Sequence, residues 1–559
     1  MIIRKPLFTA LFLALASCAP VKLSAPPIQT AAGTGPIDPA RLSEIVRTLA
    51  SDEFEGRGPG TAGEEKTVEY LSGEFERIGM VPGGESGGWT QTVPLLRTQL
   101  QQPGSVDIAG RTMKLGSDVY LSSIRPGDHA RITEAPMVFV GFGVSAPERQ
   151  WDDFKGVDLK DKVAIFLVND PDFGAEAGEP VAGKFGGKAM TYYGRWTYKF
   201  EEAARRGAIA AIIVHETAGA GYGWNTVQAP GGENYDVVRP AGSTLPVMLQ
   251  GWIQRDIAAD LFKRSGLDLE MLKREARTTE FRPRELKGTL SADLAVQQSR
   301  VQSSNVIGKI PGTRHADETI MYSGHWDAYG IGTPDTQGRT VRPGANDDAL
   351  GIAGIMEIAR AFKAGPAPER TLVFAAWTGE ERGLLGSEYY ALNPIYPADR
   401  MAANLTLDIL QTAGPARDVV LIGQGQSDLE DDLVRAAAAQ GRTVTPDAQP
   451  QRGLFYRADH FSLAKRGVPV LLLMGIGGGA DLIEGGRAAG DKWVSDYTAN
   501  CYHQICDAWR ADWDLRGAAQ DVALLYTIGR DLAFSRRWPQ WRSGSEFREV
   551  REGSAAARP

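Results

Sequence analysis

The chain has 559 residues, more than one hydrophobic core usually organises, so two or three domains are expected. Hydrophobic residues make up 43% of the chain and charged residues 23%, a balance typical of globular proteins rather than disordered ones. The net charge of −8 argues against a nucleic-acid-binding surface, which is basic.

The first residues have the pattern of an export signal. Arg4 and Lys5 precede an apolar run over residues 7–15, which is too short to span a bilayer comfortably but suits a signal peptide. The following LASC ends at Cys18 and resembles the lipobox of bacterial lipoproteins, which implies cleavage before this cysteine and a lipid attached to it. A plain secretory signal with an incidental cysteine is the alternative. We therefore expect residues 1–17 to be removed and the protein to be anchored in the bacterial cell envelope, facing the periplasm, or else secreted.

Residues 18–37 are rich in Ala, Pro, Thr and Gly, and predict a disordered tether. Globular structure is expected from Asp38, which has the position of an N-cap with proline at the first turn of a helix. A second helix is predicted between Thr61 and Gly79. Thr61 and Glu64 have capping-box spacing, apolar residues recur at helical intervals, and glycine is typical of a helix end.

The segment 101–285 has a different character. Short β-like runs, PMVFVGFGV and KVAIFLV, are followed by a helical stretch, YKFEEAARRG, and the strand IAAIIV, which together predict a compact β-rich or α/β module. The stretch VGFGVSAPERQWDDFKGVDLKDKVAIFLV resembles the protease-associated (PA) domain, a non-catalytic insert of several peptidase families. An ordinary part of one large domain is the alternative.

Strands and helices alternate through residues 286–535, which predicts an α/β fold with a mainly parallel, mixed central sheet flanked by helices. Together with residues 38–100 this segment is expected to form one discontinuous domain, interrupted by the β-rich insert. The tail over residues 536–559 contains Arg, Gly and Ser and is expected to be poorly ordered.

Polar side chains follow several predicted strands at the point where each strand ends. TIMYSG delivers His325 and Asp327, RTLVFAAW delivers Glu380 and Glu381, and ANLTL delivers Asp408. Ligands of open α/β sheets bind beyond the carboxyl ends of the strands, so these side chains are expected to gather at one edge.

Two further motifs lie on loops. Asp347 and Asp348 begin the helix ALGIAGIMEIARAFK, where helix capping is the alternative explanation for a pair of carboxylates. His503 follows Tyr502 near the end of the domain, where a purely structural histidine is the alternative.

Taken together, two imidazoles and three carboxylates form a set of ligands that Zn²⁺ accepts: His325, Asp347, Glu381, Asp408 and His503. One carboxylate bridging two ions, with one histidine and one further carboxylate on each, would build a two-metal site with ions about 3.5–4 Å apart. Asp327 suits the task of holding the imidazole of His325 in its ligating tautomer.

These motifs resemble a known family. SGHWDAYG, GANDDALG, WTGEERGLLGS, NLTLDIL and the Tyr502-His503 pair look like successive motifs of the co-catalytic zinc aminopeptidases of peptidase clan MH, family 28. GRGPGTAGEEK and RADHFSLAKRGVP fit as well, so the resemblance covers nearly all of residues 40–530. The same group includes glutamate carboxypeptidases, transferrin receptors and glutaminyl cyclases.

The resemblance implies a role for each site residue. His325 and Asp408 would hold one zinc ion, Glu381 and His503 the other, and Asp347 would bridge the two, with Asp327 orienting a ligand. Glu380 would be the general base. Tyr502 matches a tyrosine that stabilises the oxyanion in some members, and Tyr456 competes for that role; Asp459-His460 matches a motif expected to line the pocket or support it. Leu350 departs from the small polar residue of many members, which is expected to alter packing behind Asp347.

The expected activity is hydrolysis of the first peptide bond of peptides with a free N-terminus by a two-zinc aminopeptidase. A glutaminyl cyclase of the same fold would need one zinc ion, a carboxypeptidase would need a basic pocket that no stretch shows clearly, and a receptor-like binding protein would have lost ligands that are all present. No nucleic-acid partner is expected, and membrane contact only through lipid on Cys18. Cys501 and Cys506 are compatible with a disulfide or with two free thiols, and the oligomeric state is not predicted.

Overall fold

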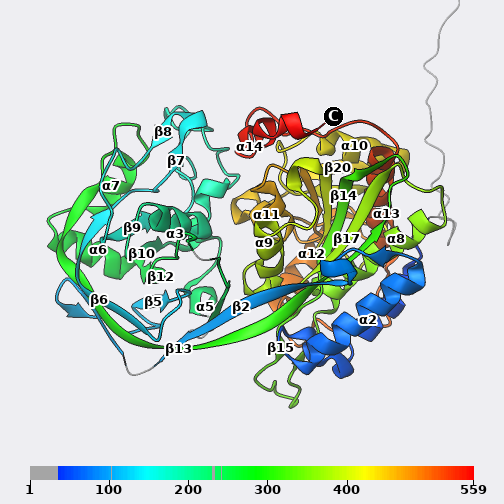
Figure 1. Cartoon of the computed structure of the whole chain (residues 1–559). Helices are drawn as coiled ribbons and strands as arrows, with labels where there is room; N and C mark the ends of the chain where they lie inside the picture. The colour runs from blue at the N-terminus through cyan, green and yellow to red at the C-terminus, as the bar shows by residue number, and fades with distance from the viewer. Residues whose placement is uncertain (1–35, 102–103, 229–232, 241, 559) are drawn as a thin grey trace, which may run out of the picture. The chain divides into compact units, whose positions relative to one another are not determined.

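The computed structural model describes residues 36–101, 104–228, 233–240 and 242–558 (Figure 1). The predicted signal peptide, Cys18 and nearly all of the predicted tether lie outside these residues. Among the described helices, none combines the length and the apolar character needed to cross a membrane.

A mixed, mainly parallel sheet organises the C-terminal half of the chain. Its strands lie in the order β21 (Val470–Leu473), β18 (Met401–Leu407), β14 (His315–His325), β17 (Arg370–Trp377) and β13 (Arg284–Ile310). The first four strands are parallel, and β13 is antiparallel to β17. The predicted fold class is therefore confirmed. Because the four strands are parallel, their carboxyl ends meet at one edge of the sheet.

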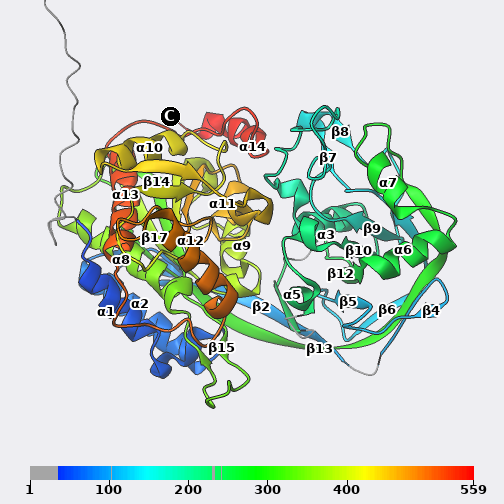
Figure 2. The same ribbon diagram turned by 180° about the vertical axis from the view of Figure 1, so that it is seen from behind.

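Helices cover both faces of this sheet (Figures 1 and 2). Along β14, Ile320 and Tyr322 point into one apolar cluster and Met321 into another, as the period-two alternation of a strand requires. The first cluster contains buried residues of α1 (Pro39–Leu49), α2 (Ala62–Ile78), α8 (Leu350–Lys363), α10 (Leu429–Ala439) and α13 (Arg516–Ala533). The second contains residues of α9 (Leu385–Leu392) and α11 (His460–Ala464).

The two N-terminal helices begin where the sequence predicts, and one cap differs in detail. The side chain of Asp38 accepts a hydrogen bond from a first-turn N–H of α1, and Gly79 ends α2 in the left-handed conformation with φ 88°. The Thr61 hydroxyl, however, donates to the carbonyl of Gly58 at 2.7 Å instead of capping α2. Glu64 accepts the N–H of Gly60 rather than that of Thr61, so the expected capping box does not form.

A second sheet occupies the segment between these helices and β14. It runs from the first part of β13 through β6 (His129–Phe139), β9 (Val163–Leu167), β10 (Ala210–His215) and β12 (Leu249–Gln254) to β5 (Val119–Ser122). Separate apolar clusters on its two faces contain residues of α6 (Arg255–Arg264) and α3 (Trp196–Arg205). The assignment of this segment to the PA family stays a prediction.

Strand β13 connects the two sheets through its length of 27 residues. Its first part pairs with β6 and with β3 (Ser105–Ile108), and its second part pairs with β2 (Thr90–Leu100) and β17. Strand β11 (Glu233–Val237) extends the pairing on the other side of β2. The smaller elements are β1 (Val81–Pro82), β4 (Arg111–Thr112), β7 (Ser145–Ala146), β8 (Trp151–Asp152), β15 (Gly330–Ile331), β16 (Val341–Arg342), β19 (Asp418–Leu421), β20 (Thr443–Pro446), α4 (Thr217–Ala220), α5 (Trp224–Gln228), α7 (Leu269–Glu275) and α12 (Gly486–Asp496).

The expectation of a poorly ordered tail is wrong. Residues after 535 include the helix α14 (Arg548–Gly553), and both Trp541 and Phe547 are buried in one apolar cluster. The buried guanidinium of Arg551 donates to the carbonyl of Met401 at 3.0 Å, at the start of β18. Two aromatic anchors and one buried arginine therefore fix a segment whose composition alone suggested disorder.

This packing predicts a measurable contribution to stability. Trp541→Ala removes a side chain that is 3% exposed and should lower the free energy of unfolding by about 3 kcal/mol or more. Phe534→Ala, at a site that is 37% exposed, is the matched control and should cost less than about 1 kcal/mol. Urea denaturation measures both, and equal midpoints for the two variants would contradict the packing of the tail.

Candidate metal centre and catalytic site

Five potential metal ligands gather at the carboxyl edge of the central sheet. His325 ends β14, Asp408 follows β18, and Glu381 lies in the single turn of helix (Glu380–Arg382) that follows β17. Two groups form, each with ligand atoms within 4.8 Å of one another. One is His325, Asp347 and Asp408, and the other is Asp347, Glu381 and His503. The residues that the sequence nominated are therefore brought together.

Asp347 belongs to both groups and faces each with a different oxygen. Its Oδ1 lies 3.1 Å from Nε2 of His325, and its Oδ2 lies 3.3 Å from Nε2 of His503. Nε2 of His503 is also 3.1 Å from Oε2 of Glu381. A carboxylate with one oxygen toward each histidine has the arrangement needed to bridge two cations.

The electrostatics of the site also fit bound cations. Burial, followed by the charge of Asp347, raises the pKa of Asp408 to about 8. Burial and the same neighbour raise the pKa of Glu381 well above its usual range. Oδ1 of Asp408 is buried without any hydrogen-bond partner among the described residues. Crowded, buried carboxylates with an unpartnered oxygen are a donor set that divalent ions such as Zn²⁺ would neutralise, so the residues present fit two zinc ions.

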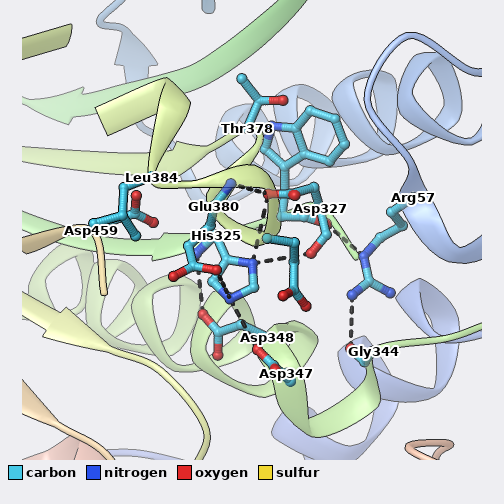
Figure 3. Close-up of polar contacts among 12 residues, drawn as sticks. Arg57, His325, Asp327, Gly344, Asp347, Asp348, Thr378, Glu380, Leu384 and Asp459 are labelled. Carbon is cyan, nitrogen blue, oxygen red and sulfur yellow. Dashed lines mark hydrogen bonds and ion pairs between the residues drawn. The ribbon is translucent and has the colours of Figure 1, made fainter. Parts of the chain in front are cut away.

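Glu380 stands beside this cluster with its carboxylate directed at His325 (Figure 3). Its Oε2 lies 3.9 Å from Nε2 of His325, and burial raises its pKa well above the usual range. Its backbone N–H donates to Oδ1 of Asp327 at 3.0 Å. A carboxylate with raised proton affinity next to the ligand cluster is suited to accept and return a proton.

Asp327 acts differently from the expectation. The ring Nδ1 of His325 lies 3.0 Å from the backbone carbonyl of Asp327, whereas the carboxylate Oδ1 is 3.7 Å away. The carbonyl therefore orients the imidazole, and the carboxylate holds the backbone of Glu380. The sequence points to Asp327, but it does not show whether the carboxylate or the backbone carbonyl of this residue faces the imidazole of His325.

Arg57 is fully buried and was not predicted from the sequence. Its guanidinium donates to the carbonyls of Trp326 (2.6 Å), Pro343 (2.6 Å), Gly344 (2.7 Å) and Leu49 (2.8 Å). It thereby ties the chain just after His325 to the loop just before Asp347 (Figure 3). The sequence feature that contains Arg57 is the GRGPGT motif, which includes no candidate metal ligand.

Two buried carboxylates hold the backbone around Asp347. Asp507 accepts the N–H groups of Asn346 and Asp347, both at 3.0 Å. Asp348 accepts the N–H of His325 at 3.2 Å and that of Gly351 at 2.9 Å, so it supports the site rather than merely starting α8. Asp507 was missed, because nothing in the sequence links it to residues so far away.

Tyr329 supports the second histidine, and it too was missed. Its hydroxyl lies 3.0 Å from Nδ1 of His503, and the two ring centroids are 4.6 Å apart. The ring of Tyr502 also lies against this imidazole, 3.6 Å away, centroid to centroid. Cys501 and Cys506 form a disulfide that closes the loop containing His503.

The two tyrosines considered for the oxyanion differ in their surroundings. Tyr456 donates its hydroxyl to Glu546 at 2.7 Å, which commits that proton elsewhere. Burial raises the pKa of Tyr502, so its hydroxyl keeps its proton at neutral pH and is able to donate. The hydroxyl of Tyr456 is thus already engaged with Glu546, which leaves Tyr502 as the candidate.

Asp459, His460 and Leu350 lie close to the site without joining the two ligand groups. Asp459 accepts the hydroxyl of Ser387 at 2.6 Å. His460 packs against Phe455, and burial lowers its pKa to about 3, so the ring is neutral. Leu350 is buried in the main apolar cluster at the start of α8. None of the three residues belongs to either ligand group.

Comparisons with known proteins find similarity to peptidases. Residues 305–527 match the family model described as Peptidase family M28. A probable zinc metalloprotease of Pyrenophora teres f. teres is 36% identical over 110 residues, which are 20% of this chain and 23% of that protein. One from Pyricularia oryzae is 42% identical over 91 residues, 16% of this chain and 18% of that protein. The chain thus spans about a fifth of the length of these relatives.

Among solved structures, an aminopeptidase from Aneurinibacillus sp. strain AM-1 is 20% identical, with 89% of this chain and 94% of that chain covered and a TM-score of 0.47. BSAP, a zinc aminopeptidase from Bacillus subtilis, is 17% identical, with 89% and 95% covered and a TM-score of 0.43.

The contact between Tyr329 and His503 predicts a defect in metal binding. Tyr329→Phe keeps the ring but removes the partner of Nδ1, and should weaken zinc binding in one of two sites by about 10- to 100-fold. Competition with a chromogenic chelator measures the affinity. Tyr396→Phe removes a similar hydroxyl, bonded to the carbonyl of Gly83 away from the site, and should leave the titration unchanged. Identical titrations for both variants would contradict the role of Tyr329.

Proposed function

We propose that this protein is an M28-type zinc metallopeptidase that acts as an aminopeptidase on peptides with a free N-terminus. The observation that carries the proposal is the carboxylate of Asp347, placed between two imidazoles that each have a further carboxylate beside them. The match of residues 305–527 to the M28 family supports it. In this proposal His325, Asp347 and Asp408 hold one zinc ion, and Asp347, Glu381 and His503 hold the second.

The chain's own residues supply the remaining steps. Zinc ions bound here would lower the pKa of a water molecule and polarise the scissile carbonyl. Glu380 takes one proton from the attacking water and passes it to the leaving amine, so the peptide C–N bond breaks while the carboxylate is restored. Tyr502 donates a hydrogen bond to the oxyanion as it develops. Asp327 keeps Glu380 in place through its backbone N–H.

We weigh three alternatives against the aminopeptidase. A glutaminyl cyclase needs one zinc ion and no bridging carboxylate, whereas both ligand groups share Asp347. A receptor-like binding protein needs neither a general base nor a complete ligand set, and Glu380 lies beside such a set in this chain. A carboxypeptidase needs a basic pocket beside the metal centre in addition to the ligands, and a preference for peptides with a blocked N-terminus would favour it.

A substitution of the base separates catalysis from metal binding. Glu380→Gln keeps the size of the side chain but cannot accept the proton, so turnover of aminoacyl-nitroanilides should fall by about 10²- to 10⁴-fold. Zinc content measured by atomic absorption should stay near two ions per chain.

The controls for this experiment test the activity itself. N-acetylated substrates should resist the wild-type protein, and a chelator should abolish activity until Zn²⁺ is restored. Chelator-resistant cleavage would refute the metal assignment, preference for blocked N-termini would refute the aminopeptidase assignment, and a fully active Glu380→Gln variant would refute the choice of base.

We also propose that the protein is attached to the bacterial envelope through lipid on Cys18 and faces the periplasm. The support is the sequence LASC after a short apolar run. Cys18→Ser should move the protein from the membrane fraction to the soluble fraction of the producing cells. An unchanged distribution would favour a plain secretory signal.

A further inference from the structure

Arg195 is a buried cation that the catalytic proposal does not use. The residue is 8% exposed, and its Nε has no hydrogen-bond partner among the described residues. None of the ion pairs found among those residues includes its guanidinium. Burying a charge without a counter-ion is costly, so such a group is retained where something else binds it.

The chain fixes the segment that carries Arg195 with several specific contacts. The buried carboxylate of Asp170 accepts both the N–H (2.6 Å) and the hydroxyl (2.7 Å) of Thr191. The N–H of Met190 donates to the carbonyl of Pro450 at 3.2 Å, and the ring of Tyr192 lies 5.2 Å from that of Phe461, centroid to centroid. The segment is therefore fastened to the loop that leads into Arg457.

Arg457 is a second cation beside the catalytic residues. The strongest electrostatic neighbours of Arg457 are Tyr502, Tyr222 and Glu380. Those of Arg195 are Arg457 and three tyrosines, including Tyr502. Burial, followed by the charge of Arg457, lowers the pKa of Arg195 to about 10, so both groups stay protonated at neutral pH. Arg457 offsets part of the charge of Glu380, but no carboxylate is among these neighbours of Arg195.

Arg452, close to Arg457 in the sequence, has a guanidinium with a hydrogen-bond acceptor. Arg452 is half-buried, and its Nη1 donates to the carbonyl of Ile476 at 3.2 Å. No such acceptor is found for Arg195 or for the side chain of Arg457 among the described residues. Neither guanidinium thus has a hydrogen-bond or ion-pair partner among the described residues, and only Arg457 has a carboxylate, Glu380, as an electrostatic neighbour.

We infer that Arg195 and Arg457 bind a carboxylate group of the substrate. A planar guanidinium matches a carboxylate with two parallel N–H···O bonds, and a bound carboxylate would relieve the repulsion between the two cations. The inference rests on the proposed function, because the same site would cleave the peptide. The carboxylate has two possible sources: the side chain of an acidic N-terminal residue, or the free C-terminus of a dipeptide.

Paired substrates that differ only in this charge test the inference. The first pair is the nitroanilides of glutamate and glutamine, and the second is alanyl-alanine with alanyl-alanine amide. The zinc-loaded full-length protein should show a kcat/KM about 10- to 100-fold higher for the charged member of one pair. The pair that discriminates identifies the source of the carboxylate.

Variants then assign the discrimination to the arginines. Arg195→Met should lower the ratio of charged to neutral substrate by about tenfold or more, mainly through KM, and Arg195→Lys should restore part of it. Arg264→Met is the matched control, because this exposed arginine of the same segment pairs with Asp260 and should leave the ratio unchanged. Thermal melting verifies that each variant is folded, and Arg457→Met should act like Arg195→Met.

The outcomes distinguish the two proposals. If the neutral substrates are cleaved but the wild-type ratio is near one in both pairs, the carboxylate site is refuted and the aminopeptidase stands. The carboxylate site is likewise refuted if Arg195→Met slows both members of a pair equally. If no member of either pair is cleaved by the zinc-loaded protein, the proposed function fails and the inference fails with it. Should Arg195→Met not fold, the wild-type ratios and Arg457→Met decide.

Discussion

The structure around the candidate site depends on one constraint, the mutual repulsion of carboxylates that are buried together. Asp347, Asp408 and Glu381 crowd against each other, and burial raises the pKa of both Asp408 and Glu381. Such a cluster is stable only when cations share it, and two imidazoles that face opposite oxygens of Asp347 mark where those cations would lie. The neighbouring polar groups are arranged to hold this cluster in place.

The supporting groups act on the backbone more than on the ligands themselves. Arg57 binds carbonyls on both sides of the loop between His325 and Asp347. Asp507 accepts the N–H groups of Asn346 and Asp347, where that loop ends. These contacts fix the main chain that carries the candidate ligands. The ligand side chains therefore have less conformational freedom to lose when a metal ion binds, and in this sense the site is preorganised.

Sequence patterns predicted the sheet and brought forward the candidate ligands because both depend on local order. Strand β14 ends at His325, polar residues follow β17 and β18, and parallel strands place these positions at one edge. The adjacent Glu380 and Glu381 illustrate the same logic. Consecutive side chains diverge, so that Glu380 lies 3.9 Å from Nε2 of His325 and Glu381 lies 3.1 Å from Nε2 of His503.

The features that sequence patterns did not predict depend on contacts between distant segments. Tyr329, Asp507 and Arg57 have ordinary neighbours in the sequence, and only the fold places them against the ligands. The buried tail was missed for the same reason, since Trp541 is buried only because distant segments of the chain cover it. No spacing rule contains that information.

A basic site formed by residues from distant segments leaves no basic stretch in the sequence. Arg195 and Arg457 come from segments far apart in the chain, so no window of sequence contains both. The fold joins them because the segment after Asp170 is bonded to the loop before Arg457. In our proposal, a carboxylate site assembled from two segments separates substrate selection from metal binding. Under our proposals, the edge with the candidate metal ligands would fix the chemistry, and the segment over residues 101–285 would set which substrate charge is accepted. Changes in that segment would then alter specificity without disturbing the candidate metal ligands.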